Sequence, residues 1–127
     1  VKQKDQGVTV IASHYTGPYL MVWSEELGRN MSAEQYFQER WADVQRDPEF
    51  LVESETGKTI IDGKEARWAV FSQMISGKKH RIVQYWLTDG ARGHNVSGSA
   101  EPGKFSEYKS QFESAAQSFK IAGSSRR

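Results

Sequence analysis

Three histidines, His14, His80 and His94, are the only imidazole side chains in this chain of 127 residues. Imidazole nitrogens bind zinc or transfer protons, but local zinc motifs place two ligands one helical turn apart or on alternate strand positions. No two of these histidines have that spacing, and each lies in or beside an expected turn. The pattern therefore favours histidines at the surface over a metal or catalytic site.

The sequence patterns of other kinds of catalytic site are also missing. Cysteine is absent, which excludes disulfides, thiolate metal ligands and a thiolate nucleophile. Carboxylates such as Glu25, Glu26 and Asp62 occupy loop-like positions that are usually solvated. No sequence resembles a phosphate-binding loop or a Gly-x-Ser-x-Gly nucleophile elbow. We predict that the chain is not an enzyme and has no catalytic, cofactor-binding or metal-binding residues. A hydrolytic site built from dispersed residues stays open as an alternative.

Aromatic and basic residues lie near one another around Trp68, Lys78, Arg81 and Trp86, as in some proteins that bind single-stranded nucleic acid. Rings at alternate strand positions are, however, more often buried. The formal net charge is only +1, from 17 basic and 16 acidic residues whose signs are interleaved. We therefore predict no nucleic-acid partner.

The first half of the chain predicts a hairpin and a helix. Residues 8–13 and 19–24 are rich in β-forming side chains and flank a Gly-Pro turn. Ser32 is followed three places later by Gln35, which is the capping box that starts a helix. Apolar residues then recur at helical spacing until Pro48, where the helix must have ended.

The middle of the chain predicts short strands and a long hairpin. Residues 50–52 and 59–61 flank Glu55-Thr56-Gly57-Lys58, a composition typical of a hairpin turn. After a second turn at Asp62-Gly63, two long strand-like runs, residues 65–76 and 80–88, meet across Gly77-Lys78-Lys79. We expect these runs to pair as antiparallel strands.

The last third predicts a short polar strand over residues 94–100 and a final helix that opens at Pro102. Phe105, Tyr108 and Phe112 recur at helical spacing there, with charged residues between them. The whole order predicts an α+β fold: an antiparallel sheet of about five to seven strands flanked by two main helices. We expect one domain over residues 1–127, with its ordered core at about 7–121.

This order of elements resembles the PsbP-like family. The similarity rests on the capped helix, on Gly63 and Ala66 before the long central strand, and on the run Tyr85-Trp86-Leu87-Thr88. It continues with a strand ending in Ala100 and with Phe105-x-x-Tyr108-x-x-x-Phe112 leading to Ser118-Phe119. The family includes the extrinsic P subunit of photosystem II, a Ran-binding import factor, bacterial lipoproteins and adaptors of secreted toxins. The resemblance implies an α-β-α sandwich that docks onto a protein partner.

Side-chain alternation in the long hairpin predicts one further surface. If the runs meet across a three-residue turn, one sheet face carries an apolar set made up of Trp68, Val70, Met74, Ile82 and Trp86. An exposed apolar patch usually marks a contact site, so these five residues are the predicted interaction surface. The competing interpretation is that one helix covers each face and both are buried. We expect Trp68 to be buried and Trp86 to be partly exposed.

Taken together, the residues predict a non-enzymatic protein-binding, scaffold or adaptor module. The alternatives are a pocket for a small molecule or lipid between sheet and helix, and the dispersed hydrolytic site. The partner is expected to be a protein of unknown identity, and a second copy of the chain, giving a homodimer, is the other candidate. No run approaches the ~20 apolar residues of a membrane-spanning helix. The absence of cysteine fits an extracytoplasmic compartment and the cytoplasm equally. The start at Val1 is compatible with a removed leader segment, so the compartment is left open with a periplasmic or otherwise extracytoplasmic one slightly favoured.

Overall fold

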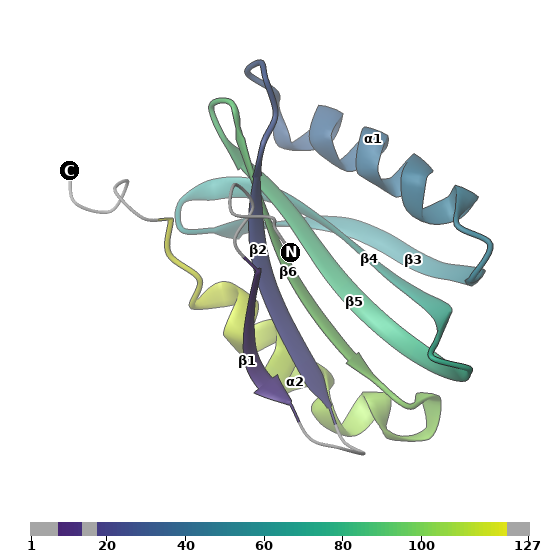
Figure 1. Cartoon of the computed structure of the whole chain (residues 1–127). Helices are drawn as coiled ribbons and strands as arrows, with labels where there is room; N and C mark the ends of the chain where they lie inside the picture. The colour runs from purple at the N-terminus through teal and green to yellow at the C-terminus, as the bar shows by residue number, and fades with distance from the viewer. Residues whose placement is uncertain (1–7, 14–17, 122–127) are drawn as a thin grey trace.

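The computed structural model describes residues 8–13 and 18–121, and side chains over 18–51 and 55–121. Eight elements follow one another along this part of the chain (Figure 1): β1 (Val8–Ser13), β2 (Tyr19–Glu26), α1 (Ala33–Arg46), β3 (Phe50–Ile61), β4 (Lys64–Ile75), β5 (Lys78–Asp89), β6 (Arg92–Ala100) and α2 (Pro102–Gln117).

The six described strands form a single antiparallel sheet in the order β1-β2-β6-β5-β4-β3. The two helices lie on opposite faces of the sheet (Figure 1). Helix α1 packs on β3, β4 and β5, and α2 packs on β3, β5 and β6. This arrangement confirms the predicted α+β fold, with an antiparallel sheet between two helices.

The capping box predicted at Ser32 is present. The Ser32 hydroxyl accepts a hydrogen bond from the Gln35 backbone N–H at 3.1 Å, and the Gln35 side chain accepts one from the Ser32 N–H at 3.0 Å. Two backbone donors that a helix start leaves unpaired are thereby satisfied. The helix ends at Arg46 because Pro48 restricts the residue before it to extended conformations.

The long hairpin turns one residue earlier than the sequence predicted. Ser76 and Gly77 both have positive φ, 52° and 80°, and they connect Ile75 to Lys78 as a two-residue turn. The predicted three-residue turn at Gly77-Lys78-Lys79 is therefore wrong. The observed turn has two residues and the predicted turn has three. Because side chains alternate along a strand, this difference in turn length places every side chain of β5 on the opposite face from the one predicted.

Strand β3 is continuous from Phe50 to Ile61, so the predicted hairpin turn at Glu55-Thr56-Gly57-Lys58 is also wrong. Gly57 pairs with Trp68 of β4. A Cβ atom at Gly57 would lie 2.5 Å from Cζ2 of Trp68, far inside van der Waals contact. Glycine is therefore needed at this position because the Trp68 ring packs closely over it, and not because the chain turns there. The second predicted turn, at Asp62-Gly63, is confirmed by positive φ at both residues.

Each sheet face has its own hydrophobic core. On the α1 face, Trp41 contacts Phe71 and Trp86 edge to face, with ring centroids 5.3 and 6.2 Å apart. On the α2 face, Phe105 and Phe112 pack against side chains of β4, β5 and β6. The Phe112 ring lies directly over Gly98, where a Cβ atom would approach the ring to 2.4 Å.

We predict that Phe112→Ala lowers the free energy of unfolding by about 3 to 5 kcal/mol, because it leaves a cavity above Gly98 that the rigid sheet cannot fill. Urea denaturation followed by circular dichroism measures this loss. The exposed neighbour Gln111→Ala is the matched control and should change stability by less than about 0.5 kcal/mol. A folded Phe112→Ala protein with an unchanged midpoint would show that this face of α2 does not form the core.

Candidate functional site

The five residues of the predicted interaction surface do not share a face. The β4–β5 register pairs Trp68 with Tyr85 and Val70 with Val83, and these residues belong to the α2 face. Residues Ile82 and Trp86 lie instead in the core beneath α1, with 4% and 1% of their surface exposed. Met74 is partly exposed near the end of β4 and alternates with Val70. The predicted shared surface is therefore wrong.

The expected exposure of the two tryptophans is also reversed. Trp68 is partly exposed, and Trp86 is buried among Phe37, Trp41 and Phe71. The physical reason is the turn at Ser76-Gly77, which rotates β5 relative to the expected alternation. One helix lies on each face, as in the competing interpretation, but the faces are not fully buried as that interpretation also expected.

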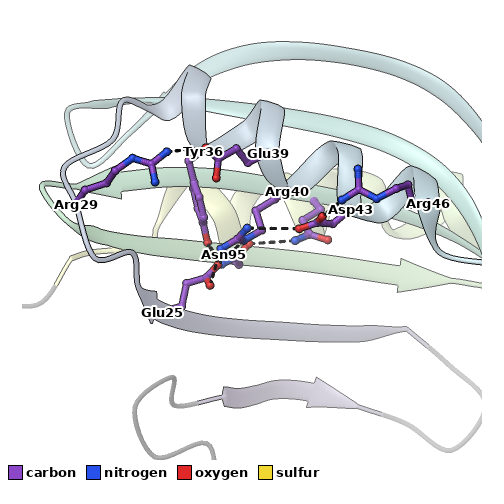
Figure 2. A network of polar contacts seen from close by, with 9 residues as sticks. Glu25, Arg29, Tyr36, Glu39, Arg40, Asp43, Arg46 and Asn95 are labelled. Carbon is purple, nitrogen blue, oxygen red and sulfur yellow. Dashed lines mark hydrogen bonds and ion pairs between the residues drawn. The ribbon is translucent and has the colours of Figure 1, made fainter.

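One helix cannot cover a whole face of this sheet. Six strands at a spacing of about 4.8 Å place the outer strands about 24 Å apart. A helix with its side chains is about 10 Å wide. Helix α1 packs on β3, β4 and β5, and β2 lies to its side (Figure 2). A lane of sheet along β2 therefore lies outside the footprint of α1.

Three large side chains, Tyr19, Met21 and Trp23, stay partly exposed in this lane, and we call them the β2 strip. The register pairs Trp23 with Asn95 of β6, whose side chain reaches Tyr36 of α1, so the β2 strip lies on the α1 face. The other two residues of the strip pair with small β6 side chains, Ser99 and Ser97. The large side chains of the β2 strip therefore form a ridge, and the small serine side chains of β6 beside it form a lower, polar floor.

A partly buried polar network closes one end of this lane (Figure 2). The Tyr36 hydroxyl donates to Glu25 at 2.6 Å and accepts from the Asn95 amide at 2.7 Å. Arg40 makes two hydrogen bonds to the Glu25 carboxylate, at 2.9 and 3.0 Å. Gln84 donates to the Asn95 carbonyl oxygen at 3.1 Å. We call these five residues the Tyr36 network, and it ties α1 to β2, β5 and β6.

Gly93 of β6 leaves the space that the Tyr36 ring occupies. A Cβ atom at this position would lie 2.4 Å from Cζ of Tyr36. The ring can therefore lie flat on the sheet and bring its hydroxyl to Glu25 only because residue 93 has no side chain.

The network shifts the pKa values of its members. Burial alone would raise the pKa of Glu25, but the hydrogen bonds from Arg40 and Tyr36 and the charge of Arg40 outweigh it and hold this pKa below its ordinary value. Burial and the hydrogen bond to Glu25 raise the pKa of Tyr36. The bonds to Glu25 raise the pKa of Arg40. All three groups therefore keep one protonation state at neutral pH.

Ion pairs continue along the outer side of α1. Arg29 pairs with Glu39 at 2.7 Å, and Asp43 pairs with both Arg40 and Arg46. These groups are mostly exposed, where such pairs contribute little to stability. They give the helix border of the lane a polar surface with both signs of charge.

His94 is buried, with 5% of its surface exposed, so its expected surface position is wrong. Its Nδ1 lies 2.7 Å from the Ser24 hydroxyl, and its ring lies 5.7 Å from the Phe119 ring. Burial lowers the pKa of His94, so the ring is neutral at pH 7. His80 is partly buried, and His14 lies outside the described residues. Within the described part of the chain, no three His, Asp or Glu side chains gather to hold a metal ion.

A cleft of about 290 Å³ opens on the opposite face, between α2 and the sheet, and we call it the α2 cleft. Two cross-strand pairs, Trp68 with Tyr85 and Val70 with Val83, form its floor. Lys58 and Thr59 of β3 lie along one side, and Lys109, Glu113 and Gln117 of α2 lie along the other. A 3.2 Å hydrogen bond from Gln117 to Thr59 joins the two sides.

Sequence reasoning found part of these sites. Trp68 and Val70, which line the α2 cleft, were among the predicted contact residues. The Tyr36 network was missed, because Glu25, Arg40 and Asn95 are far apart in sequence and only the strand order brings them together. The spacing of Lys109, Glu113 and Gln117, four residues apart each time, marks one side of α2 and could have been found.

No family model matches the sequence, and no curated protein sequence matches it. Solved structures do show the fold. A protein of unknown function from Pseudomonas aeruginosa, PA94, superposes with a TM-score of 0.79 at 12% identity, over 95% of this chain and 87% of that one. Cyanobacterial PsbP from Synechocystis gives a TM-score of 0.59 at 11% identity, over 93% of this chain and 82% of that one.

The second of these structures confirms the PsbP-like fold that the sequence resemblance implied. Among the described residues, neither helix is long and apolar enough to cross a membrane.

We predict that the Tyr36 network makes stability dependent on acid pH. A carboxylate with a depressed folded-state pKa stabilises the fold above its unfolded pKa, about 4.3 for glutamate, and this contribution is lost as the pH falls through the folded value. At pH 7, Glu25→Gln should cost about 1.5 to 3 kcal/mol, the range for hydrogen bonds to charged groups. The difference from the unmodified protein should shrink steadily below pH 4.3 or so.

Urea denaturation at a series of pH values checks this prediction. The exposed Glu39→Gln variant, which removes only a surface ion pair with Arg29, is the matched control and should stay within about 1 kcal/mol of the parent at every pH. Parallel stability curves for Glu25→Gln and the parent protein between pH 7 and pH 3 would contradict the assigned role of Glu25.

Proposed function

We propose that the protein is a non-enzymatic binding module that holds a helical segment of a protein partner on the β2 strip, beside α1. The observation that carries the proposal is the strip itself. Tyr19, Met21 and Trp23 are three large side chains that stay partly exposed on a sheet face that α1 covers only in part. Aromatic side chains and methionine are enriched at protein interfaces and dominate their binding energy.

The dimensions of the lane favour a helix as the occupant. The sheet is wide enough for two helices side by side on one face, and α1 occupies one of the two places. The eight residues of β2 extend for roughly 26 Å, which matches about 18 residues of α-helix at 1.5 Å each. The small side chain of the partly exposed Ser97 lets a helix backbone approach the floor closely.

The surroundings of the lane favour an amphipathic segment. Its apolar side would contact the β2 strip, and its polar side would face solvent and the mixed charges of Arg40 and Asp43 on α1. Such helix-in-groove recognition is a common mode of protein binding. The resemblance of the sequence to PsbP-like proteins, which include adaptors, agrees with a docking role.

We assign no catalytic role to the Tyr36 network, although the pKa values of its members are shifted. Perturbed pKa values often mark active sites. In the Tyr36 network, however, the hydroxyl, the carboxylate and the guanidinium are hydrogen-bonded to one another, which explains their shifts through structure alone. None of these groups is left to attack or protonate a substrate.

We predict that a synthetic amphipathic helix of about 18 residues, with Leu and Ala on one side and Lys and Glu on the other, binds the purified protein. Met21→Glu should weaken this binding at least about tenfold, because a partner helix would bury an unpaired carboxylate. Isothermal titration calorimetry measures the affinity, and circular dichroism checks that the variant is folded.

The matched control is Ile60→Glu, which places the same charge at an exposed hydrophobic residue of the opposite edge strand, β3. This variant should bind the peptide within about twofold of the parent protein. Equal losses in the two variants, or equal binding of a scrambled peptide, would contradict the proposal. A dimer that Met21→Glu dissociates, seen by light scattering, would mean that a second copy of the chain occupies the lane instead.

A further inference from the structure

We propose that His94 is a pH-sensitive contact that holds residues 118–121, the segment after α2, against the sheet, and that protonation of its ring releases this segment. We call residues 118–121 the C-terminal strap. His94 pairs with Leu87 of the α2-face core, so this contact lies on the opposite face of the sheet from the β2 strip. The proposal does not depend on a partner beside α1.

The C-terminal strap is attached to the sheet at two places. The Phe119 ring packs on the His94 ring, with the centroids 5.7 Å apart. Two residues later, the Ile121 backbone N–H donates a hydrogen bond to the Asp62 carboxylate at 2.9 Å. The Ile121 side chain is buried in the α2-face core, with 2% of its surface exposed. Phe119 therefore rests on His94, and Ile121 rests on the turn between β3 and β4.

The surroundings of the His94 ring suit its neutral form. The Nδ1 atom lies 2.7 Å from the Ser24 hydroxyl oxygen. The Nε2 atom is buried and has no hydrogen-bond partner among the described residues. A neutral imidazole has a single N–H, and its other nitrogen is an acceptor only. We therefore assign the tautomer in which the Nδ1–H donates to Ser24 and Nε2 carries no proton.

Protonation would place a second N–H on Nε2, where the described part of the chain offers no acceptor. Burying a charged donor without an acceptor costs free energy. The Phe119 side chain that covers the ring is apolar and cannot accept a conventional hydrogen bond. If the C-terminal strap moves away, water can reach the ring and satisfy both N–H groups. Protonation therefore favours the open state, in which the strap has left the sheet.

The charged side chains near His94 do not supply the missing acceptor. Burial, the larger effect, and the charge of Arg92 lower the pKa of His94, whereas the charge of Asp89 acts in the opposite direction. Three ion pairs lie at this end of the sheet: Arg92 with Glu26, Lys64 with Asp89, and Lys120 with Asp62. Each carboxylate in these pairs already has a cationic partner.

The direction of the pH dependence follows from the two states of the ring. In the closed state, with the strap on the sheet, the pKa of His94 lies below its ordinary value, and the exposed ring of the open state regains a value of about 6.5. The equilibrium constant for opening therefore rises as the pH falls below about 6.5. The ordinary pKa limits this rise to about 30-fold between pH 7.5 and pH 5. The range lies above the one in which Glu25 should affect stability.

Hydrogen exchange of the full chain, followed by two-dimensional ¹H–¹⁵N NMR, tests the proposal. The Ile121 amide is hydrogen-bonded in the closed state and reports opening of the strap. Its protection factor should fall at least about threefold between pH 7.5 and pH 5. The Val83 amide, in central strand β5, should stay at least about tenfold better protected throughout, because the sheet itself remains closed.

Three variants assign the effect to His94. His94→Gln keeps a polar side chain that does not titrate, so the protection of Ile121 should change by less than about 1.5-fold over the same pH range. His80→Gln is the matched control, because His80 lies on the opposite sheet face and is partly exposed, and it should keep the full change. Asp62→Asn keeps an acceptor oxygen for Ile121 and should also keep the change. Circular dichroism checks that each variant is folded.

Three results would overturn the proposal: constant Ile121 protection from pH 7.5 to pH 5 in the parent protein, an equal fall in His94→Gln, or equal protection of Ile121 and Val83. The last would mean that the whole molecule opens and not the strap. If His94→Gln does not fold, titration of the His94 ring signals in the parent protein decides. A pKa of about 6.5 or above would contradict the proposal, because protonation would then not favour the open state. None of these results bears on peptide binding at the β2 strip at pH 7.

Discussion

The two-residue turn at Ser76-Gly77 determines what every other part of the molecule can bury. It fixes the register of β4 against β5 and so places Phe71 and Ile82 on one face and Val70 and Val83 on the other. Each helix then meets a floor suited to it. Aromatic rings beneath α1 interlock edge to face, whereas α2 lies over smaller side chains and over Gly98. A turn longer by one residue would reverse β5 and leave both cores mismatched.

The sequence correctly predicted the elements whose signals lie within a few residues of one another. Its predictions were wrong where the conformation depends on a contact between residues far apart in the chain. The Ser32 capping box, the stop at Pro48 and the α2 stripe are written within a few residues of one another, and the structure has all of them. Gly57 looked like a turn because its reason for being glycine, the Trp68 ring, belongs to another strand. The register of β4 against β5 depends on whether the turn has two or three residues, and composition alone does not decide this length. The candidate surface inherited that error, so Trp68 and Val70 line a cleft while Trp86 is in the core.

Neither helix covers its whole face of the sheet, and the uncovered parts of the two faces differ. Each face has one helix where the width allows two. Beside α1, the uncovered strand carries the large and partly exposed side chains of the β2 strip, closed at one end by the Tyr36 network. Beside α2, the uncovered part is hollow, because Trp68 folds down over Gly57 and the helix bridges to β3 through Gln117.

The strand order also bears on when the β2 strip forms during folding. Strands β3 to β6 follow one another as neighbouring hairpins, whereas β2 pairs with β6 across the sheet, and its Ser24 contacts His94, 70 residues later in the chain. Contacts between distant residues require the closure of a long loop and tend to slow folding. We expect β2 to join the sheet after the meander has formed. The β2 strip, the proposed partner site, would then be assembled last, so a chain that is still folding would not yet present it.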